Sequence, residues 1–263
     1  MTVETALLAL GAGFLVAVVT TPVGVSGAVF LLPIQLDILR IPSPAVTPTN
    51  LLFNVVSTPG ALLRYRSVRA LGGPLTRHIL IGTLPGVVIG TIVRIWLAPG
   101  DRVFRLLAAA LLLPLGIWLC LGNRTRPGPG PGPGRTLPAP IVAAVGTGAG
   151  VAGGIYGIGG GSLLGPILVG TGMSVAVVAP AALTATFLTS VAGVLTYAVL
   201  SLITASPVSP EWAIGLLCGA GGLIGGYVGA QLQPSIPERA LRTLLGILAL
   251  GLATTYMVQA LMA

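Results

Sequence analysis

Charged side chains are scarce in this chain of 263 residues. Only 7% of the residues are Asp, Glu, Lys or Arg, whereas typical soluble domains contain about 25%. Hydrophobic residues make up 54%, and the mean hydropathy is +1.02. This scarcity of charge excludes a soluble globular domain. Apolar runs of about 20 residues recur along the whole length, and short alternating strands are missing. The sequence therefore predicts an all-α, polytopic membrane protein.

Residue types that carry enzymatic or metal chemistry are also rare. The chain has one histidine, two cysteines and five acidic residues. They form no His-Glu-x-x-His motif, no carboxylate pair and no serine beside a plausible base. Cys120 and Cys218 both lie in apolar segments, which favours small hydrophobic residues over a disulfide or metal pair. We therefore expect no enzyme, no metal site, no cofactor and no nucleic-acid partner.

The charges that are present are unbalanced. Every basic residue is arginine, and the formal net charge is +8. An excess of arginine is typical of cytoplasmic loops and of contacts with anionic lipid headgroups. A net positive field also favours an anionic solute. The net charge alone does not choose between these explanations.

One segment of different composition divides the chain. Residues 123–138 contain an uninterrupted Pro-Gly alternation from 127 to 134, which cannot bury a core and predicts an extended linker. The linker separates a first membrane repeat, 1–122, from a second, 139–263. The hydrophobic regions expected in these repeats are 5–40, 45–63, 75–97, 103–122, 139–173, 175–203, 211–233 and 240–262.

The two halves resemble each other. The run GIGGGSLLGPI at 157–167 has an inexact copy, GVSGAVFLLPI at 24–34, placed 133 residues earlier. We call these two runs the glycine elements. Further matches keep nearly the same offset: Thr47–Tyr65 with Ala179–Tyr197, Gly86 and Gly90 with Gly222 and Gly226, and Arg102 and Arg105 with Arg239 and Arg242. Several matches in register indicate an internal duplication.

The duplication predicts two inverted repeats. Regions 5–40 and 139–173 are too long for one crossing of a bilayer core, so we expect each to fold back at its glycine element as a broken, re-entrant hairpin. Each half then holds one broken hairpin and about three transmembrane helices, giving 8–10 membrane segments. If the linker is cytoplasmic, this arrangement puts nine arginines inside and four outside. If regions 5–40 and 139–173 each crossed the bilayer once, seven would lie inside and six outside. The excess of arginine on the cytoplasmic side therefore favours the inverted arrangement. Arg94, among the outside four, is expected near a span end, where it can snorkel.

The glycine elements are the first candidate binding site. Non-helical backbone at membrane depth is tolerated only against protein or a water-filled cavity. We expect Ser162 in the first turn of a short helix, whose amides and dipole suit an oxyanion. Ser26 and Gly27 repeat this design, and Pro33 and Pro166 are expected to kink or end the short helices. The alternative is close helix packing through small residues. The glycines proposed to approach the ligand in the second element are Gly159, Gly160 and Gly161.

A second candidate is the polar helix that follows the first element. Asn50, Asn54 and Ser57 recur at i, i+4 and i+7 and therefore share one face. The equivalent helix of the second half offers Thr186 among other hydroxyls. Interhelical hydrogen bonding and substrate contact are equally good explanations. Asp37 is either the partner of Arg40 in a surface ion pair or a group that carries a coupling proton.

These residues resemble the TauE/SafE family of sulfite and organosulfonate exporters over nearly the whole chain. The resemblance rests on the Gly-x-Gly-Gly-Gly-x4-Pro element at 157–166 and its degraded copy at 24–33, where Ser26 and Ala28 replace two glycines. It also rests on the pair Thr49-Asn50, which opens the next helix, and on Arg64-Tyr65-Arg66 at the exit of that helix. The segment Gly193–Tyr197 is also similar. The resemblance implies a plasma-membrane carrier for sulfur-containing anions that exploits the proton motive force. The chain departs from the pattern where Ala181-Ala182 stand opposite Thr49-Asn50, so unequal contributions from the two halves are expected.

Together these observations predict a multi-pass protein of the cell membrane and a specific activity. We expect a secondary transporter for small sulfur oxyanions, such as sulfite or a sulfonate, that works by alternating access, with export as the direction. A passive anion channel and a non-transporting membrane scaffold subunit are the alternatives. The expected partners are the anion, the lipid bilayer and a coupling proton. A homo-oligomer is among the assemblies that the sequence leaves open.

Overall fold

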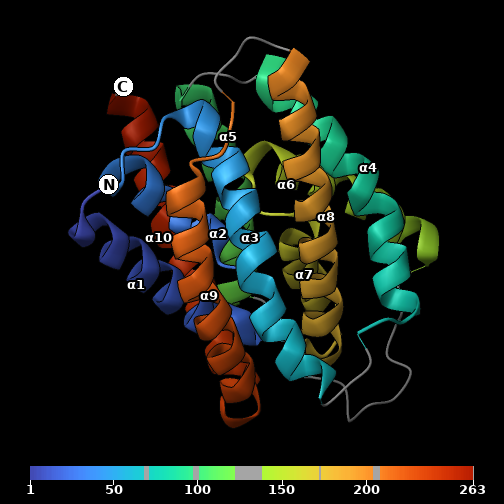
Figure 1. Ribbon diagram of the computed structural model, residues 1–263. Coiled ribbons are helices and arrows are strands. Elements are labelled where there is room, and N and C mark those ends of the chain that lie inside the picture. Colours follow the sequence, from blue (N-terminus) through green and yellow to red (C-terminus); the bar gives the residue numbers. More distant parts are fainter. Residues whose placement is uncertain (68–70, 97–100, 122–137, 172, 204–207, 263) are drawn as a thin grey trace.

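The computed structural model describes residues 1–67, 71–96, 101–121, 138–171, 173–203 and 208–262. These residues form helices and connecting turns (Figure 1). The elements are α1 Val3–Thr20, η1 Thr21–Val23, α2 Ala28–Pro33, η2 Ile34–Ile38, α3 Ser43–Arg66, α4 Pro74–Trp96, α5 Asp101–Leu121, α6 Ala139–Tyr156, α7 Gly160–Gly170, α8 Val175–Ile203, α9 Trp212–Leu232, η4 Gln233–Ser235 and α10 Glu238–Met262. Except for residue 138, the proposed linker lies outside the described residues.

The helices have the lengths and composition of membrane spans. Within the described part of the chain, five stretches are long and apolar enough to cross a bilayer: Val3–Val23, Pro74–Trp96, Ala139–Tyr156, Val175–Ile203 and Trp212–Ser235. Large apolar side chains such as Leu7, Leu202 and Ile203 are exposed on the outer surface. Such exposure is costly in water and expected against lipid acyl chains. The all-helical membrane class predicted from composition is confirmed.

Both glycine elements interrupt a helix. In the first half α1 and η1 end before Gly24 (φ +80°), and α2 begins after Gly27 (φ +85°). In the second half α6 ends at Gly157 (φ +72°), and Gly159 (φ +71°) precedes α7. These positive φ values place the backbone where side chains are disfavoured, so glycine is required at each position. The predicted helix breaks are confirmed.

The two prolines after the breaks behave differently. Pro33 is the last residue of α2, and the chain continues as the π-helical turn η2. Pro166 lies inside α7, which continues for four more residues to Gly170. The expectation that proline ends or kinks the short helix therefore fits α2, whereas Pro166 does not end α7.

The helices of the two halves are interleaved rather than packed as separate bundles. α1 packs along α9, and α6 packs along α4, so the first α-helix of each half lies against the fourth α-helix of the other. α3 contacts both α8 and α9, and α5 packs against α10. In Figure 1, α3 descends while its counterpart α8 ascends. Each half therefore depends on the other for its core.

Glycines at four-residue spacing let the interleaved helices approach closely. A Cβ on Gly82, Gly86 or Gly90 of α4 would meet backbone carbonyl oxygens of α6 within about 2.4 Å. On α9, the glycines whose Cβ atoms would meet carbonyls of α1 are Gly221, Gly225 and Gly229. Such spacing of small residues is how membrane helices pack tightly. The expected match of Gly86 and Gly90 with Gly222 and Gly226 is therefore wrong in register, because Gly222 faces Phe53 and Ser57 of α3.

One polar contact occurs in both halves. The hydroxyl of Tyr65 on α3 donates to the carbonyl of Thr21 (3.3 Å), and that of Tyr197 on α8 donates to the carbonyl of Gly154 (3.5 Å). Thr21 and Gly154 are 133 residues apart, the offset of the glycine elements. Both tyrosines are buried. Each therefore fastens the end of a broken helix in its own half.

Candidate functional site

The two glycine elements meet through a pair of serines. The hydroxyl of Ser162 donates to the hydroxyl of Ser26 (3.0 Å) and accepts from the Ser26 amide (3.3 Å). The hydroxyls of Ser162 and Thr186 form a third hydrogen bond of 3.0 Å. Ser26 is 4% exposed and Ser162 2%. Three residues proposed from sequence are thus brought together in a buried polar cluster, which we call the serine cluster.

The start of α7 contributes backbone donors beside this cluster. The amide of Gly160 donates to the hydroxyl of Thr189 on α8 (3.2 Å). Gly161 and Ser162 follow in the first turn, where a helix has no acceptors of its own for its amides. The positive end of the helix dipole lies at the same place. The first turn of α7 therefore has the donors and the polarity that an anion requires.

The glycines of the second element lie close to their neighbours. A Cβ on Gly161 would come within 2.0 Å of the Ala182 carbonyl oxygen, and one on Gly160 within 2.5 Å of Thr83. A Cβ on Gly159 would meet Thr186 and Ser190, both on α8. Gly27 is equally confined in the first half, against Val16 and Thr20 of α1. The proposed backbone cradle is tightly closed in this conformation.

The two asparagines of α3 hold the broken backbones. The Nδ2 of Asn50 donates to the carbonyls of Ala28 (3.1 Å) and Tyr156 (3.5 Å), which lie one in each half. The Nδ2 of Asn54 donates to the carbonyl of Gly157 (3.2 Å). Both side chains are 0% exposed. Each asparagine therefore stabilises backbone at a helix break, and Asn50 joins the two breaks to each other.

Arg94 is a buried cation that the sequence does not single out as a site residue. Its guanidinium is 2% exposed and donates to the carbonyl and hydroxyl of Ser43 and to the hydroxyl of Thr47. Thr47 in turn donates to the carbonyl of Ile155, next to the residue held by Asn50. The expectation that Arg94 snorkels is wrong, because hydroxyl and carbonyl acceptors at the start of α3 hold the guanidinium inside the protein. Buried ionisable residues in membrane helices are rare and commonly functional, which makes Arg94 a candidate site residue.

Asp37 lies in a different environment. It is exposed, in the π-helical turn η2, and its carboxylate accepts from the Nε2 of Gln259 on α10 (3.0 Å). The serine cluster is buried by contrast. The structure therefore places the proposed proton carrier on the surface and the proposed anion-binding residues in the interior.

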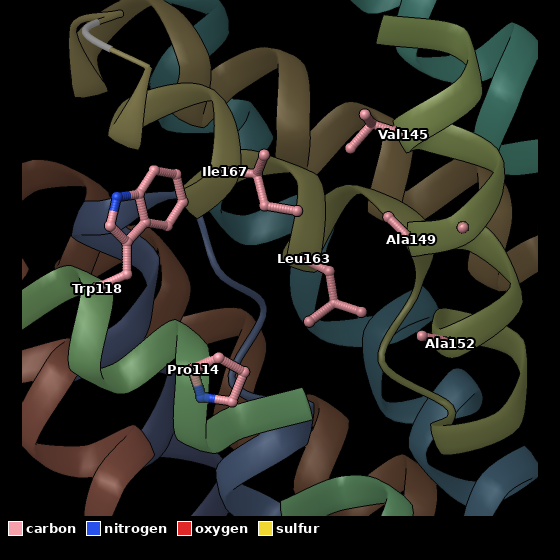
Figure 2. Close-up of a pocket in the computed structure, with 8 residues that line it drawn as sticks. Pro114, Trp118, Val145, Ala149, Ala152, Leu163 and Ile167 are labelled. Atoms are coloured by element: carbon pink, nitrogen blue, oxygen red, sulfur yellow. The ribbon is translucent and has the colours of Figure 1, made fainter. Parts of the chain in front are cut away.

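An apolar cavity flanks the site without belonging to it. It has a volume of about 570 Å³ and lies between α5, α6 and α7. Figure 2 shows Pro114 and Trp118 on one side, Leu163 and Ile167 of α7 on another, and Val145, Ala149 and Ala152 of α6 opposite. These side chains offer no hydrogen-bond donor except the Trp118 indole. The cavity is therefore unsuited to an oxyanion, although Leu163 directly follows Ser162.

Comparison with known protein families gives a match over nearly the whole chain. The family described as sulfite exporter TauE/SafE matches residues 9–256. The matched range covers both glycine elements, the serine cluster and Arg94. Comparison with curated proteins and with solved structures gave no match.

Proposed function

Because this chain belongs to the TauE/SafE sulfite exporter family, we propose that it is a secondary transporter that carries a small sulfur oxyanion by alternating access. The observation that carries the proposal is the hydrogen bond between Ser26 and Ser162. It joins two helix breaks, one from each half of a multi-pass membrane protein. Substrate sites built where broken helices meet are common in transporters with internal repeats.

Two further features support an anion at this place. The first turn of α7 places backbone amide donors and the positive end of the helix dipole beside the serine cluster. The buried Arg94 connects to the same region through Thr47 and Ile155. Positive charge near a buried ligand site lowers the cost of removing an anion from water. We assign Ser26, Gly27, Gly159, Gly160, Gly161, Ser162 and Thr186 to the binding site, with Asn50 and Asn54 holding its backbone.

The packing suggests which part moves. The site is closed to solvent, so transport requires a rearrangement that exposes the serine cluster. α5 and α10 pack mainly on each other; α5 contacts α7, while α10 contacts η1. This pair therefore touches both broken segments with few other contacts. We propose that the two halves are inverted repeats and that the α5–α10 pair rocks against the other helices. A proton gradient would drive this movement in the direction of export, with Asp37 as the candidate proton carrier.

Sulfite flux in proteoliposomes tests the proposal. Saturable uptake that responds to an imposed proton gradient is expected, and Ser162→Ala should weaken it while Ser67→Ala, at the exposed end of α3, should not. Current proportional to voltage without saturation would indicate a passive channel instead. The tight packing around Gly160 and Gly161 also fits a non-transporting scaffold subunit. In that case neither the natural protein nor the Ser162→Ala and Ser67→Ala variants would show sulfite flux.

A further inference from the structure

Several buried side-chain oxygens on α3 and α8 have no hydrogen-bond partner among the described residues. On α3 they are Asn50 Oδ1, Asn54 Oδ1 and Thr58 Oγ1, and on α8 Ser190 Oγ. The four residues are 0–3% exposed. Residues 50, 54 and 58 are four apart and share one face of α3. Orphaned buried polar atoms are rare in folded proteins, and each points to a missing partner such as water or a ligand.

Three of these four side chains, those of Asn50, Asn54 and Ser190, lie at the two breaks. The Nδ2 of Asn50 contacts the carbonyls of Ala28 and Tyr156, and the Nδ2 of Asn54 contacts that of Gly157. Since both atoms of an amide group share one planar carbon, each Oδ1 lies beside the same backbone. The Ser190 Oγ lies 3.0 Å from the position that a Cβ on Gly159 would occupy. A ligand held at the breaks would therefore meet acceptors as well as donors.

The chemistry of the orphaned atoms restricts the ligand. An amide oxygen can only accept hydrogen bonds. An oxyanion without protons also only accepts, so it would leave Asn50 Oδ1 and Asn54 Oδ1 unpaired and repel them. A ligand that carries an O–H or N–H group beside its anionic oxygens would satisfy both sets of partners. Its O–H or N–H group would donate to the asparagine oxygens, and its anionic oxygens would accept from the α7 amides.

The positive charge at the site restricts the charge of the ligand. It comprises the guanidinium of Arg94 and the partial charge at the start of α7, about half an elementary charge. This suits one negative charge, and burying a second without a matching cation would be costly. Charge and hydrogen bonding thus select the same chemical class.

We propose that the transported species is a monoanion with its own hydrogen-bond donor, which for sulfite means hydrogensulfite rather than the dianion. Asn50 and Asn54 accept from that donor through Oδ1, and Ser190 lies within reach of the same ligand. This inference rests on the proposed function, because it assumes that the ligand binds at the serine cluster.

Two small monoanions test it on the intact protein. Sulfamate and methanesulfonate have the same charge and nearly the same shape, but sulfamate has N–H donors where methanesulfonate has a methyl group. Binding of each to the purified protein in lipid nanodiscs is measured by calorimetry, alongside sulfite flux in proteoliposomes. Sulfamate should bind at least about tenfold tighter. Ser190→Ala and Asn54→Leu should reduce this ratio, whereas Thr184→Val, whose hydroxyl bonds within α8, should keep it.

The outcomes separate the two proposals. Equal affinities, or no binding of either compound, together with saturable sulfite flux would overturn the requirement for a donor and leave the transporter function standing. A preference for sulfamate that survives in both site variants would also overturn it. Absence of sulfite flux in the natural protein would overturn the proposed function itself.

Discussion

Ser26 and Ser162 donate and accept across the centre of the protein although 136 residues separate them in the chain. Each lies at a helix break made possible by glycines at positive φ. The pair joins the two glycine elements with a hydroxyl–hydroxyl distance of 3.0 Å. Substitutions at this contact should weaken substrate binding more than they lower the stability of the fold.

Replacing either serine by alanine should weaken substrate binding. Ser26→Ala or Ser162→Ala removes one hydroxyl from the cluster, and a hydrogen bond of this kind contributes about 0.5–1.5 kcal/mol. We expect the KM for sulfite flux to rise about three- to tenfold, with a small change in thermal stability. Unchanged KM in both variants, with flux intact, would remove the serine pair from the site. Ser67→Ala is the control.

Arg94 should be needed for both stability and flux. Arg94→Met leaves the carbonyl of Ser43 without its donor and should lower the free energy of unfolding by about 1–3 kcal/mol. Arg94→Lys keeps the charge but loses the planar fork that reaches Ser43 and Thr47, so we expect partial activity. Thermal unfolding and sulfite flux measure the two effects. Arg77→Met, at an exposed position on the same helix, should match the natural protein.

Two glycines on α6 should respond oppositely to alanine. A Cβ on Gly150 would lie 2.5 Å from the Thr83 carbonyl oxygen, whereas one on Gly148, which lines the apolar cavity, would meet nothing within 4 Å. Gly150→Ala should therefore force α4 and α6 apart and cost about 1–3 kcal/mol. Gly148→Ala should stabilise by up to about 1 kcal/mol, because alanine favours the helix. Thermal unfolding in detergent measures the change in stability of each variant. Equal shifts of the unfolding temperature in the two variants would contradict the close packing of α4 on α6.

The two tyrosines that fasten the broken helices should be equivalent. Tyr65→Phe and Tyr197→Phe each remove one hydroxyl that donates to a backbone carbonyl. We expect similar losses of about 0.5–1.5 kcal/mol in the free energy of unfolding. Tyr227→Phe, on the exposed side of α9, serves as control and should have little effect. A loss confined to one half would show that the two contacts are not equivalent.

The proposed inversion of the halves can be tested by labelling. In a background with Cys120→Ala and Cys218→Ala, single cysteines at Ser67 and Ser235 should react only from the cytoplasmic side, since α3 and α9 both end at the bottom in Figure 1. A cysteine at Ser209, which precedes α9, should react only from outside. Labelling of Ser67 and Ser235 from opposite sides would rule out the inverted arrangement.

How far the sequence predicts the site varies with the residue. Ser26, Ser162 and Thr186 were proposed from the glycine elements and their neighbours, and the structure brings them together. The spacing of Asn50 and Asn54 placed them on one face, but whether that face meets substrate or backbone was open. The structure shows their Nδ2 atoms on backbone carbonyls. Arg94 gave no signal beyond its position near a span end, because its acceptors belong to another helix.

Composition and the placement of glycine are sufficient to predict the membrane class and the two helix breaks. These follow from local properties: apolar length decides what can enter a bilayer, and glycine decides where the backbone can take positive φ. Three features follow from the packing of the helices alone: which helices interleave, that Gly221 and not Gly222 faces α1, and that Arg94 turns inward. Those outcomes depend on contacts between segments far apart in the chain. The spacing of residues along one helix carries no information about which other helix lies beside it.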